Sequence, residues 1–135
     1  MLRLTAFATT ALTLSLSAAV AAPALGLVGD KTLVMFDTET LEVSGSMDVT
    51  GVDSLLGIDL RPSNGTIVGV TPDMTIVSID PATGAATEMS KMDTALPLGD
   101  TPVIVDFNPA ADKLRFMTGS TNHRVDVDTG AVTVD

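Results

Sequence analysis

The chain has 135 residues, no cysteine, and 17 acidic against seven basic side chains, which gives a formal net charge of −10. The missing cysteines exclude disulfides, thiol nucleophiles, thiolate zinc sites and iron–sulfur clusters. The excess of acids disfavours nucleic acids and anionic membrane surfaces as partners, because both carry negative charge themselves. A single domain is the expectation for this length.

The first 21 residues are predicted to form a secretory signal peptide. Arg3 lies in a short basic start, residues 4–22 form an uncharged run, and residues 19–21 have the small-x-small pattern of a cleavage site. The alternative is an uncleaved membrane anchor, since the run is nearly long enough to span a bilayer. We expect cleavage after Ala21, export to the periplasm or the extracellular space, and no stable membrane insertion afterwards. The mature chain, residues 22–135, would carry six cations and 17 acids, a net charge of −11.

Residues 22–135 predict short strands and no helix. No stretch keeps an apolar period of 3.6 residues over three turns. Residues 31–48 supply two strands, and segments rich in Ile, Val, Thr and Leu follow, separated by turns rich in Pro, Asn, Asp and Gly. These predicted strands are 55–60, 66–71, 75–80, 85–89, 103–107, 113–118, 123–127 and 131–134.

The strand-rich segments are similar to one another at a spacing of about 46 residues. Asp59 returns 47 positions on as Asp106, residues 79–87 return 46 positions on as residues 125–133, and residues 34–40 resemble the same unit without its glycine. Four short antiparallel strands per unit are typical of a β-propeller blade. The all-β chain would hold about two and a half blades and an incomplete ring, so we expect it to be the N-terminal part of a longer domain. The alternative is a complete β-sandwich of about ten strands.

Three aspartates end a strand just before a turn, at the same place in each unit. They are Asp37, Asp80 and Asp126. A carboxylate in this position accepts hydrogen bonds from the N–H groups of the turn. We therefore predict a structural role for all three.

Asp59 and Asp106 are the candidate metal ligands. Each lies in the first strand of its unit between apolar residues, and in a propeller that strand lines the central channel. A ring of carboxylates there would bind a hard cation such as Ca²⁺, the one cofactor that the sequence suggests. The alternative is that each carboxylate accepts N–H groups from the 61–62 or 108–109 corner beside it.

The densest polar group lies in the second unit. Three of the six mature cations fall between residues 113 and 124. An internal network of salt bridges is the ordinary explanation, and a binding site for a small carboxylate or a sugar is the alternative. The only histidine lies here, so no two-histidine metal site exists in the chain, whereas a His–carboxylate pair stays open. The candidate ligand-site residues are Asp112, Arg115, Asn122, His123 and Arg124.

Four motifs, in this order, resemble the domain-of-unknown-function family DUF4394, over roughly residues 26–135. The motifs are residues 57–62, 79–87, 106–115 and 122–125. The resemblance implies an exported bacterial β-protein with a propeller-like fold and no assigned activity or catalytic residue. The family domain is longer than this chain, which agrees with an incomplete ring.

The residues and the resemblance together predict an exported, non-catalytic β-repeat domain that binds an unknown small ligand or protein. No catalytic residue is predicted, and nucleic acid is not expected as a partner. The alternative function is a metal-dependent periplasmic hydrolase or lyase, whose site would be completed by C-terminal blades that this chain lacks.

Overall fold

The structure is a computed structural model that describes residues 22–135, and this part of the chain consists of strands and turns. The predicted signal peptide lies outside the described residues. Residues 22–135 form no helix long and apolar enough to cross a membrane. The all-β prediction is confirmed.

The strands form three antiparallel sheets, and each sheet follows chain order. The first sheet contains β1 (Pro23–Val28), β2 (Thr32–Asp37) and β3 (Val43–Asp48). The second contains β4 (Gly57–Arg61), β5 (Thr66–Val70), β6 (Thr75–Ile79) and β7 (Ala86–Lys91). The third contains β8 (Val103–Asn108), β9 (Lys113–Thr118), β10 (Thr121–Val125) and β11 (Val132–Val134).

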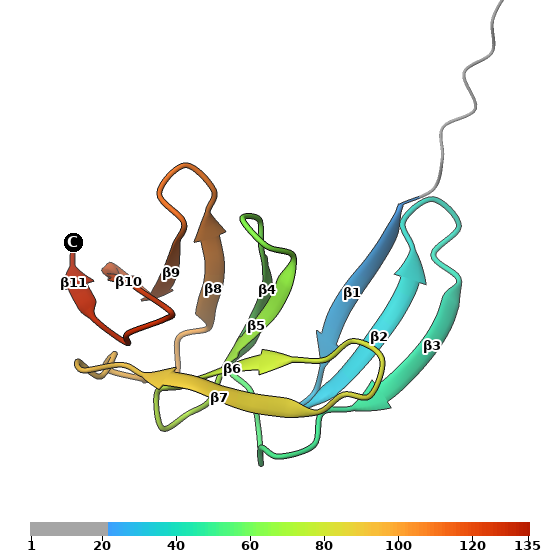
Figure 1. The fold of residues 1–135 in the computed structure, drawn as a ribbon, viewed down its shortest axis with the longest axis horizontal. Coiled ribbons are helices and arrows are strands. Elements are labelled where there is room, and N and C mark those ends of the chain that lie inside the picture. Colours follow the sequence, from blue (N-terminus) through green and yellow to red (C-terminus); the bar gives the residue numbers. More distant parts are fainter. Residues whose placement is uncertain (1–21) are drawn as a thin grey trace, which may run out of the picture.

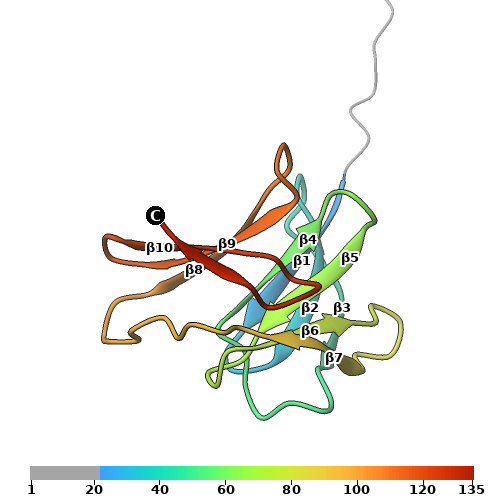
Figure 2. The ribbon, with the colours of Figure 1, turned by 60° about the vertical axis from the view of Figure 1, so that its left-hand side comes forward.

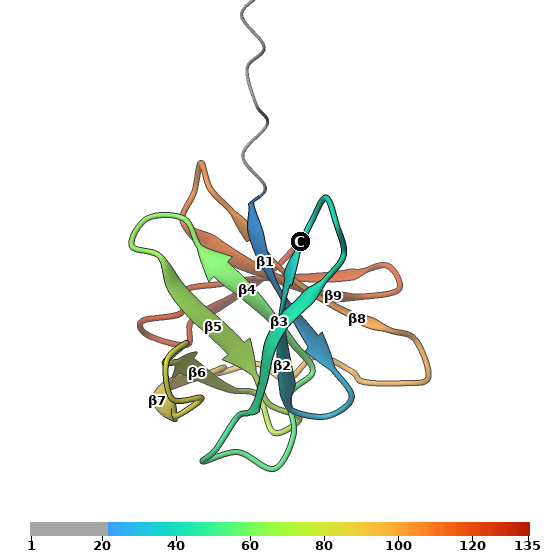
Figure 3. The same ribbon diagram turned by 90° about the vertical axis from the view of Figure 1, so that its right-hand side faces the viewer.

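The second sheet lies between the other two. Figure 1 shows the first sheet at the right, the second in the middle and the third at the left, and the turned views show the third sheet inclined to the first (Figures 2 and 3). There are three separate sheets, none of them closed, rather than the two of a β-sandwich.

Ten of the eleven strands lie within a few residues of the predicted segments. The sequence analysis missed β1, whose residues Pro-Ala-Leu-Gly-Leu-Val include proline, alanine and glycine, which strands disfavour. β1 nevertheless pairs with β2 over its whole length, from Pro23 opposite Asp37 to Val28 opposite Thr32. Pairing with an apolar neighbour therefore outweighs the weak local preference.

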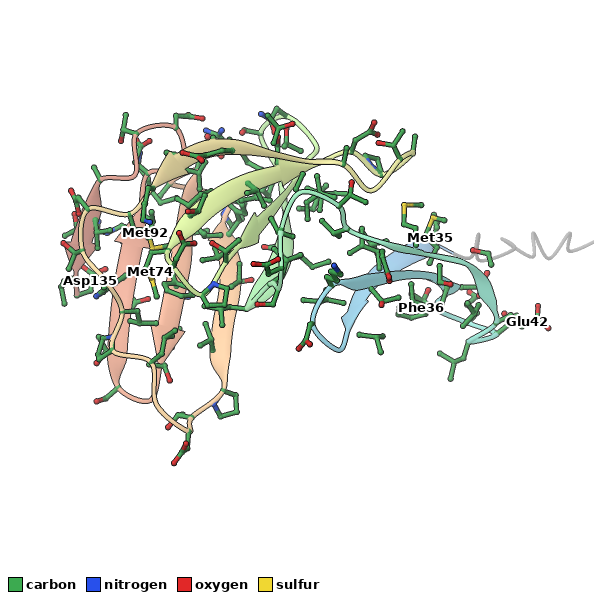
Figure 4. All side chains as sticks on the ribbon, turned by 90° about the horizontal axis from the view of Figure 1, so that it is seen from below. Met35, Phe36, Glu42, Met74, Met92 and Asp135 are labelled. Carbon is green, nitrogen blue, oxygen red and sulfur yellow. The ribbon has the colours of Figure 1, made fainter. Side chains whose placement is uncertain are left out.

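Two apolar cores hold the sheets together. The larger lies between the second and third sheets, where Met74 and Met92 also pack (Figure 4). The smaller lies between the first and second sheets. The larger core includes Val68, Ile76, Leu114 and Phe116. The smaller core includes Leu33, Val77 and Ile79.

Strands β4 and β8, the first strands of the second and third sheets, approach each other closely. A side chain at Gly57 would place its Cβ 2.7 Å from Cγ2 of Val105, so only glycine fits there. Two residues on, Asp59 Oδ2 accepts a hydrogen bond from the Phe107 N–H at 2.6 Å. This carboxylate therefore links the second sheet to the third.

The structural role predicted for the three strand-end aspartates is confirmed. Oδ1 of Asp37 accepts the N–H groups of the two residues at positions +2 and +3, and Asp126 does the same. Asp80 accepts one N–H group and the hydroxyl of Thr83. The N–H groups of Thr40 and Glu39 lower the pKa of Asp37. The N–H of Ala82 and the hydroxyl of Thr83 lower the pKa of Asp80.

A left-handed residue closes each of these corners, and its N–H donates to the aspartate carbonyl four residues earlier. Two corners use Gly84 and Gly130, with φ of 73° and 77°. A Cβ on them would lie 2.6 Å from the Asp48 carbonyl oxygen and 1.9 Å from that of Lys91, because each corner packs on the outer strand of the preceding sheet. The first corner uses Leu41, a residue that is 71% exposed.

Leu41→Gly is expected to stabilise the protein by about 0.5–1 kcal/mol. Leucine at φ 59° is strained by roughly 1–2 kcal/mol, and this gain exceeds the entropy that glycine adds to the unfolded chain. Urea unfolding measures the difference. Val43→Gly, at an exposed strand position nearby, is the control and should destabilise. A loss of stability in both variants would contradict this explanation.

Candidate functional site

The outer face of the third sheet gathers most of the predicted ligand-site residues. Side chains alternate along each strand, so those of Leu114, Phe116 and Val125 point into the core and their neighbours point outward. Arg115 lies opposite Arg124 on β10 and opposite Asp106 on β8. Asn122 is next along the same face of β10. The strand register therefore brings Arg115, Asn122 and Arg124 together.

A cavity of about 340 Å³ opens on this face. Three of the six cations that follow residue 21 line it, together with two amide side chains and one carboxylate, in a chain that is otherwise acidic. The full lining is Asn108, Ala111, Lys113, Arg115, Asn122, Arg124 and Asp135. Figure 4 shows Asp135 at the far end of the molecule from Met35, Phe36 and Glu42 of the first sheet.

Two of the three cations are held by carboxylates. Arg124 Nη2 lies 2.6 Å from Asp135 Oδ1, and Lys113 Nζ lies 2.5 Å from Asp126 Oδ2. The ammonium of Lys113 lowers the pKa of Asp126 to about 2. Arg115 makes no ion pair within residues 22–135, so its guanidinium is the cation most available to a ligand.

Asn122, which lines the cavity, has one unsatisfied polar atom. Its Nδ2 donates to Asp135 Oδ2 at 3.3 Å, whereas its buried Oδ1 has no hydrogen-bond partner among the described residues. A buried amide oxygen without a donor costs free energy.

Asp112 belongs to a different cluster, between the second and third sheets. Arg61 reaches across from β4, whose end it forms, and binds two carboxylates of the third sheet. Its Nη2 lies 2.7 Å from Asp112 Oδ2, and its Nη1 lies 2.9 Å from Asp128 Oδ1. The guanidinium lowers the pKa of both carboxyl groups, and they raise the pKa of Arg61. Asp112 therefore belongs to an internal network of salt bridges, the ordinary explanation for a polar group of this kind.

His123 also lies apart from the cavity, on the inner face of β10. It is 2% exposed, and its Nδ1 has no hydrogen-bond partner within residues 22–135. Burial lowers its pKa, which favours the neutral ring. The structure thus separates the five predicted residues into three at the cavity, one in the Arg61 cluster and one in the core.

His123→Met is expected to weaken the dependence of stability on acid. Because the folded pKa of His123 is depressed, its contribution is complete above the unfolded pKa, near 6.5, and is lost as the pH falls below it. The slope is at most about 1.4 kcal/mol per pH unit. The free energy of unfolding, measured in urea at pH 7 and pH 5.5, should differ less in the variant than in the wild type. Equal differences in the variant and the wild type would show that a group other than His123 causes the pH dependence.

The candidate metal ligands occupy different surroundings. Both oxygens of Asp59 already accept N–H groups, from Leu60 in its own strand and from Phe107 in the next sheet. Asp106 is exposed on the outer face of the third sheet, opposite Arg115. Within residues 22–135 no three His, Asp or Glu side chains gather as a metal set. The calcium site stays a prediction that these contacts do not support.

Arg61 is the residue that the sequence analysis missed. Its two partners are 51 and 67 positions away, so no local pattern joins them. The sequence offers one signal for it: Arg61 is one of only six cations after residue 21, and it directly precedes the Pro62 turn.

A larger cavity, of about 640 Å³, lies at the loops between the first and second sheets. Its lining includes Asp53, Asp73 and Glu88. Asp73 is bound by Lys91 at 2.8 Å and by the hydroxyl of Thr71 at 2.5 Å, and these contacts lower its pKa. The carboxylate of Asp73 is therefore already satisfied by the protein.

Comparison with known protein families places most of the chain in one of them. The family described as Domain of unknown function (DUF4394) matches residues 32–135. No curated protein matches the chain.

Proposed function

Because this chain belongs to the DUF4394 family, whose model matches residues 32–135, we propose that it is an exported, non-catalytic, propeller-like β-repeat domain that binds a small carboxylate ligand. The binding site is the cavity on the outer face of the third sheet. The single observation that carries the proposal is the convergence of Lys113, Arg115 and Arg124 on that cavity.

The chemistry of the lining favours a carboxylate over other ligands. Arginine presents a planar fork that matches a carboxylate, and Arg115 makes no ion pair among the described residues. Asn122 and Asn108 supply amide groups for the polar atoms of the same ligand. Nucleic acid is an unsuitable occupant because the chain as a whole is strongly acidic.

The matching face of the second sheet supports a specialised role for this surface. There, the positions that correspond to Arg115, Met117 and Asn122 in strand register are Val68, Val70 and Ile76, all fully buried. The third sheet replaces two of these three apolar residues by a cation and an amide. Such a replacement suits a polar ligand better than the packing of another apolar sheet.

The propeller-like part of the proposal rests on the arrangement of the sheets. They are small antiparallel meanders that follow one another along the chain, with the inner strands β4 and β8 in contact. The same aspartate corner occurs in all three. Export rests on the predicted signal peptide of residues 1–21.

Calorimetric titration of the full chain with citrate, a small tricarboxylate, tests the function. We expect saturable binding with a dissociation constant of roughly 0.1–1 mM, because the cations are exposed to water. Arg115→Gln should weaken it at least tenfold. Lys91→Gln removes one charge from an exposed side chain of the second sheet and is the matched control. The absence of heat with the wild type, or an equal loss in both variants, would overturn the proposal.

A further inference from the structure

His123 is buried without the hydrogen bonds that a charged ring needs. The residue is 2% exposed, and its Nδ1 has no partner within residues 22–135. A neutral imidazole can leave this nitrogen as an unpaired acceptor, whereas an imidazolium carries an N–H on both ring nitrogens. Because a buried charge without partners is far more costly than a buried neutral ring, protonation of His123 requires that the ring reach water.

The elements around the ring provide no counter-charge. The residues opposite it in register are Phe116 on β9 and Val134 on β11, and the core that β10 faces is apolar. Burial is the only cause that lowers the pKa of His123, so no carboxylate among the described residues compensates for it. The charged side chains of β9, β10 and β11 lie on the outer face of the sheet: Lys113, Arg115, Arg124 and Asp135.

The charged groups on the other side of this core are exposed as well. On β7, these are Glu88 and Lys91. In the loop between β7 and β8, Asp93 and Asp100 are exposed, and Asp93 Oδ1 accepts the N–H of Val132 at 3.2 Å. The ring therefore lies among apolar side chains on every side.

Few other contacts hold β10 against the core. Side chains alternate along the strand, so Thr121, His123 and Val125 point inward, and only Val125 among them is apolar. β10 lies between β9 and β11 (Figure 1), and β11 has three residues, of which Thr133 and Val134 are exposed. Both flanking strands and the core belong to residues 22–135, so the burial of the ring is already complete within this part of the chain.

We propose that protonation of His123 releases β10 and β11 from the core and takes the carboxylate site apart. Asn122 and Arg124, on either side of His123 in the strand, line that site, and movement of β10 separates them from Arg115 on β9. The consequence for a ligand rests on the proposed function, whereas the opening is a property of the sheet itself.

The burial of the ring sets the direction of the pH dependence. Its pKa is lowered in the closed sheet and returns to about 6.5 once the ring reaches water. The open form therefore binds the proton more tightly, and opening becomes more favourable as the pH falls below about 6.5.

Amide hydrogen exchange of the full chain, measured without ligand at pH 7 and pH 5.5, tests the opening. Protection factors remove the intrinsic effect of pH on exchange. Those of β10 should fall about eightfold between the two pH values and lie below those of β5, also in dilute urea, because a local opening exposes little surface. Equal protection of β10 and β5 at both pH values would overturn the proposal, since only global unfolding would then expose the ring.

Two variants show whether His123 is the group that titrates. His123→Met keeps an apolar side chain of similar bulk, and His123→Gln keeps a polar one. Neither titrates, so the protection of β10 should be the same at both pH values in each variant that folds. An eightfold fall that persists in the variants would overturn the proposal.

Citrate separates the opening from the ligand site. At pH 7, about 10 mM citrate should raise the protection of the β10 amides at least tenfold in the wild type, because it binds the closed sheet alone with a dissociation constant of 1 mM or less. Arg115→Gln should abolish this effect. Unchanged protection with citrate, together with the eightfold response to pH, would overturn the proposed function and its coupling to His123, and would support the proton-driven opening alone.

Discussion

Arg61→Met is expected to lower the free energy of unfolding by about 2–4 kcal/mol. Removing one partner of a buried ion pair costs about 3–5 kcal/mol, and the partial exposure of the two carboxylates reduces that figure through solvent screening. The Arg61 side chain is 11% exposed, and methionine preserves its bulk but leaves Asp112 and Asp128 facing each other unneutralised. Urea unfolding at pH 7 measures the loss.

The same variant has a distinctive pH dependence. Arg61 depresses the pKa of Asp112 and Asp128, so the stability that they contribute is present above the unfolded pKa of 3.8 and is lost as the pH falls through the folded values. The cost of Arg61→Met should therefore shrink below pH 4. Arg124→Met, which removes an exposed pair with Asp135, is the control and should cost less than about 1 kcal/mol. A loss of stability in Arg61→Met that does not change with pH would show that the substitution acts through packing instead.

Gly130→Ala is expected to destabilise the protein by about 3–5 kcal/mol, from overpacking and backbone strain together. Its φ is 77°, and the new Cβ would lie 1.9 Å from the carbonyl oxygen of Lys91. The third sheet would have to move away from the outer strand of the second to accommodate it. Thermal and urea unfolding both report the change.

Gly29→Ala separates the two causes of that effect. Gly29 has a positive φ of 61°, but nothing lies within 4 Å of a Cβ placed on it. Gly29→Ala should therefore lower the free energy of unfolding by only about 1–2 kcal/mol, which is the strain of the left-handed backbone. Equal losses at Gly29 and Gly130 would mean that the close approach between sheets contributes nothing.

Local features of the fold were predictable from sequence, because they depend on neighbouring residues. Turn residues and β-branched runs locate ten strands, and an aspartate before a turn finds its N–H donors two or three positions later. β1 was missed because its composition is poor in strand formers and its pairing with β2 is a tertiary effect.

Contacts between sheets were not predictable in the same way. The sequence predicts that Asp59 either binds a metal or accepts N–H groups of its own corner, whereas its Oδ2 accepts an N–H from the next sheet. The partners of Arg61 are likewise distant in sequence. Such contacts depend on how the sheets are placed, which a single sequence does not record.

The candidate site was predictable in part. Asn122 and Arg124 are two positions apart on one strand and so share a face, whereas His123 between them must point to the opposite face. The sequence analysis places all three in one candidate site because they are adjacent in the sequence. Arg115 joins the first two because the register of β9 and β10 places it opposite Arg124. Asp112 was grouped with them by proximity alone, although its carboxylate faces Arg61.

Mapping of backbone amide chemical shifts during a citrate titration tests the central claim most directly, because it locates the ligand as well as detecting it. The proposed site predicts saturable shifts concentrated on Arg115, Asn122 and Arg124, with Arg61 and its neighbours in the second sheet unchanged. Shifts that are absent, that do not saturate, or that centre on another sheet would contradict it.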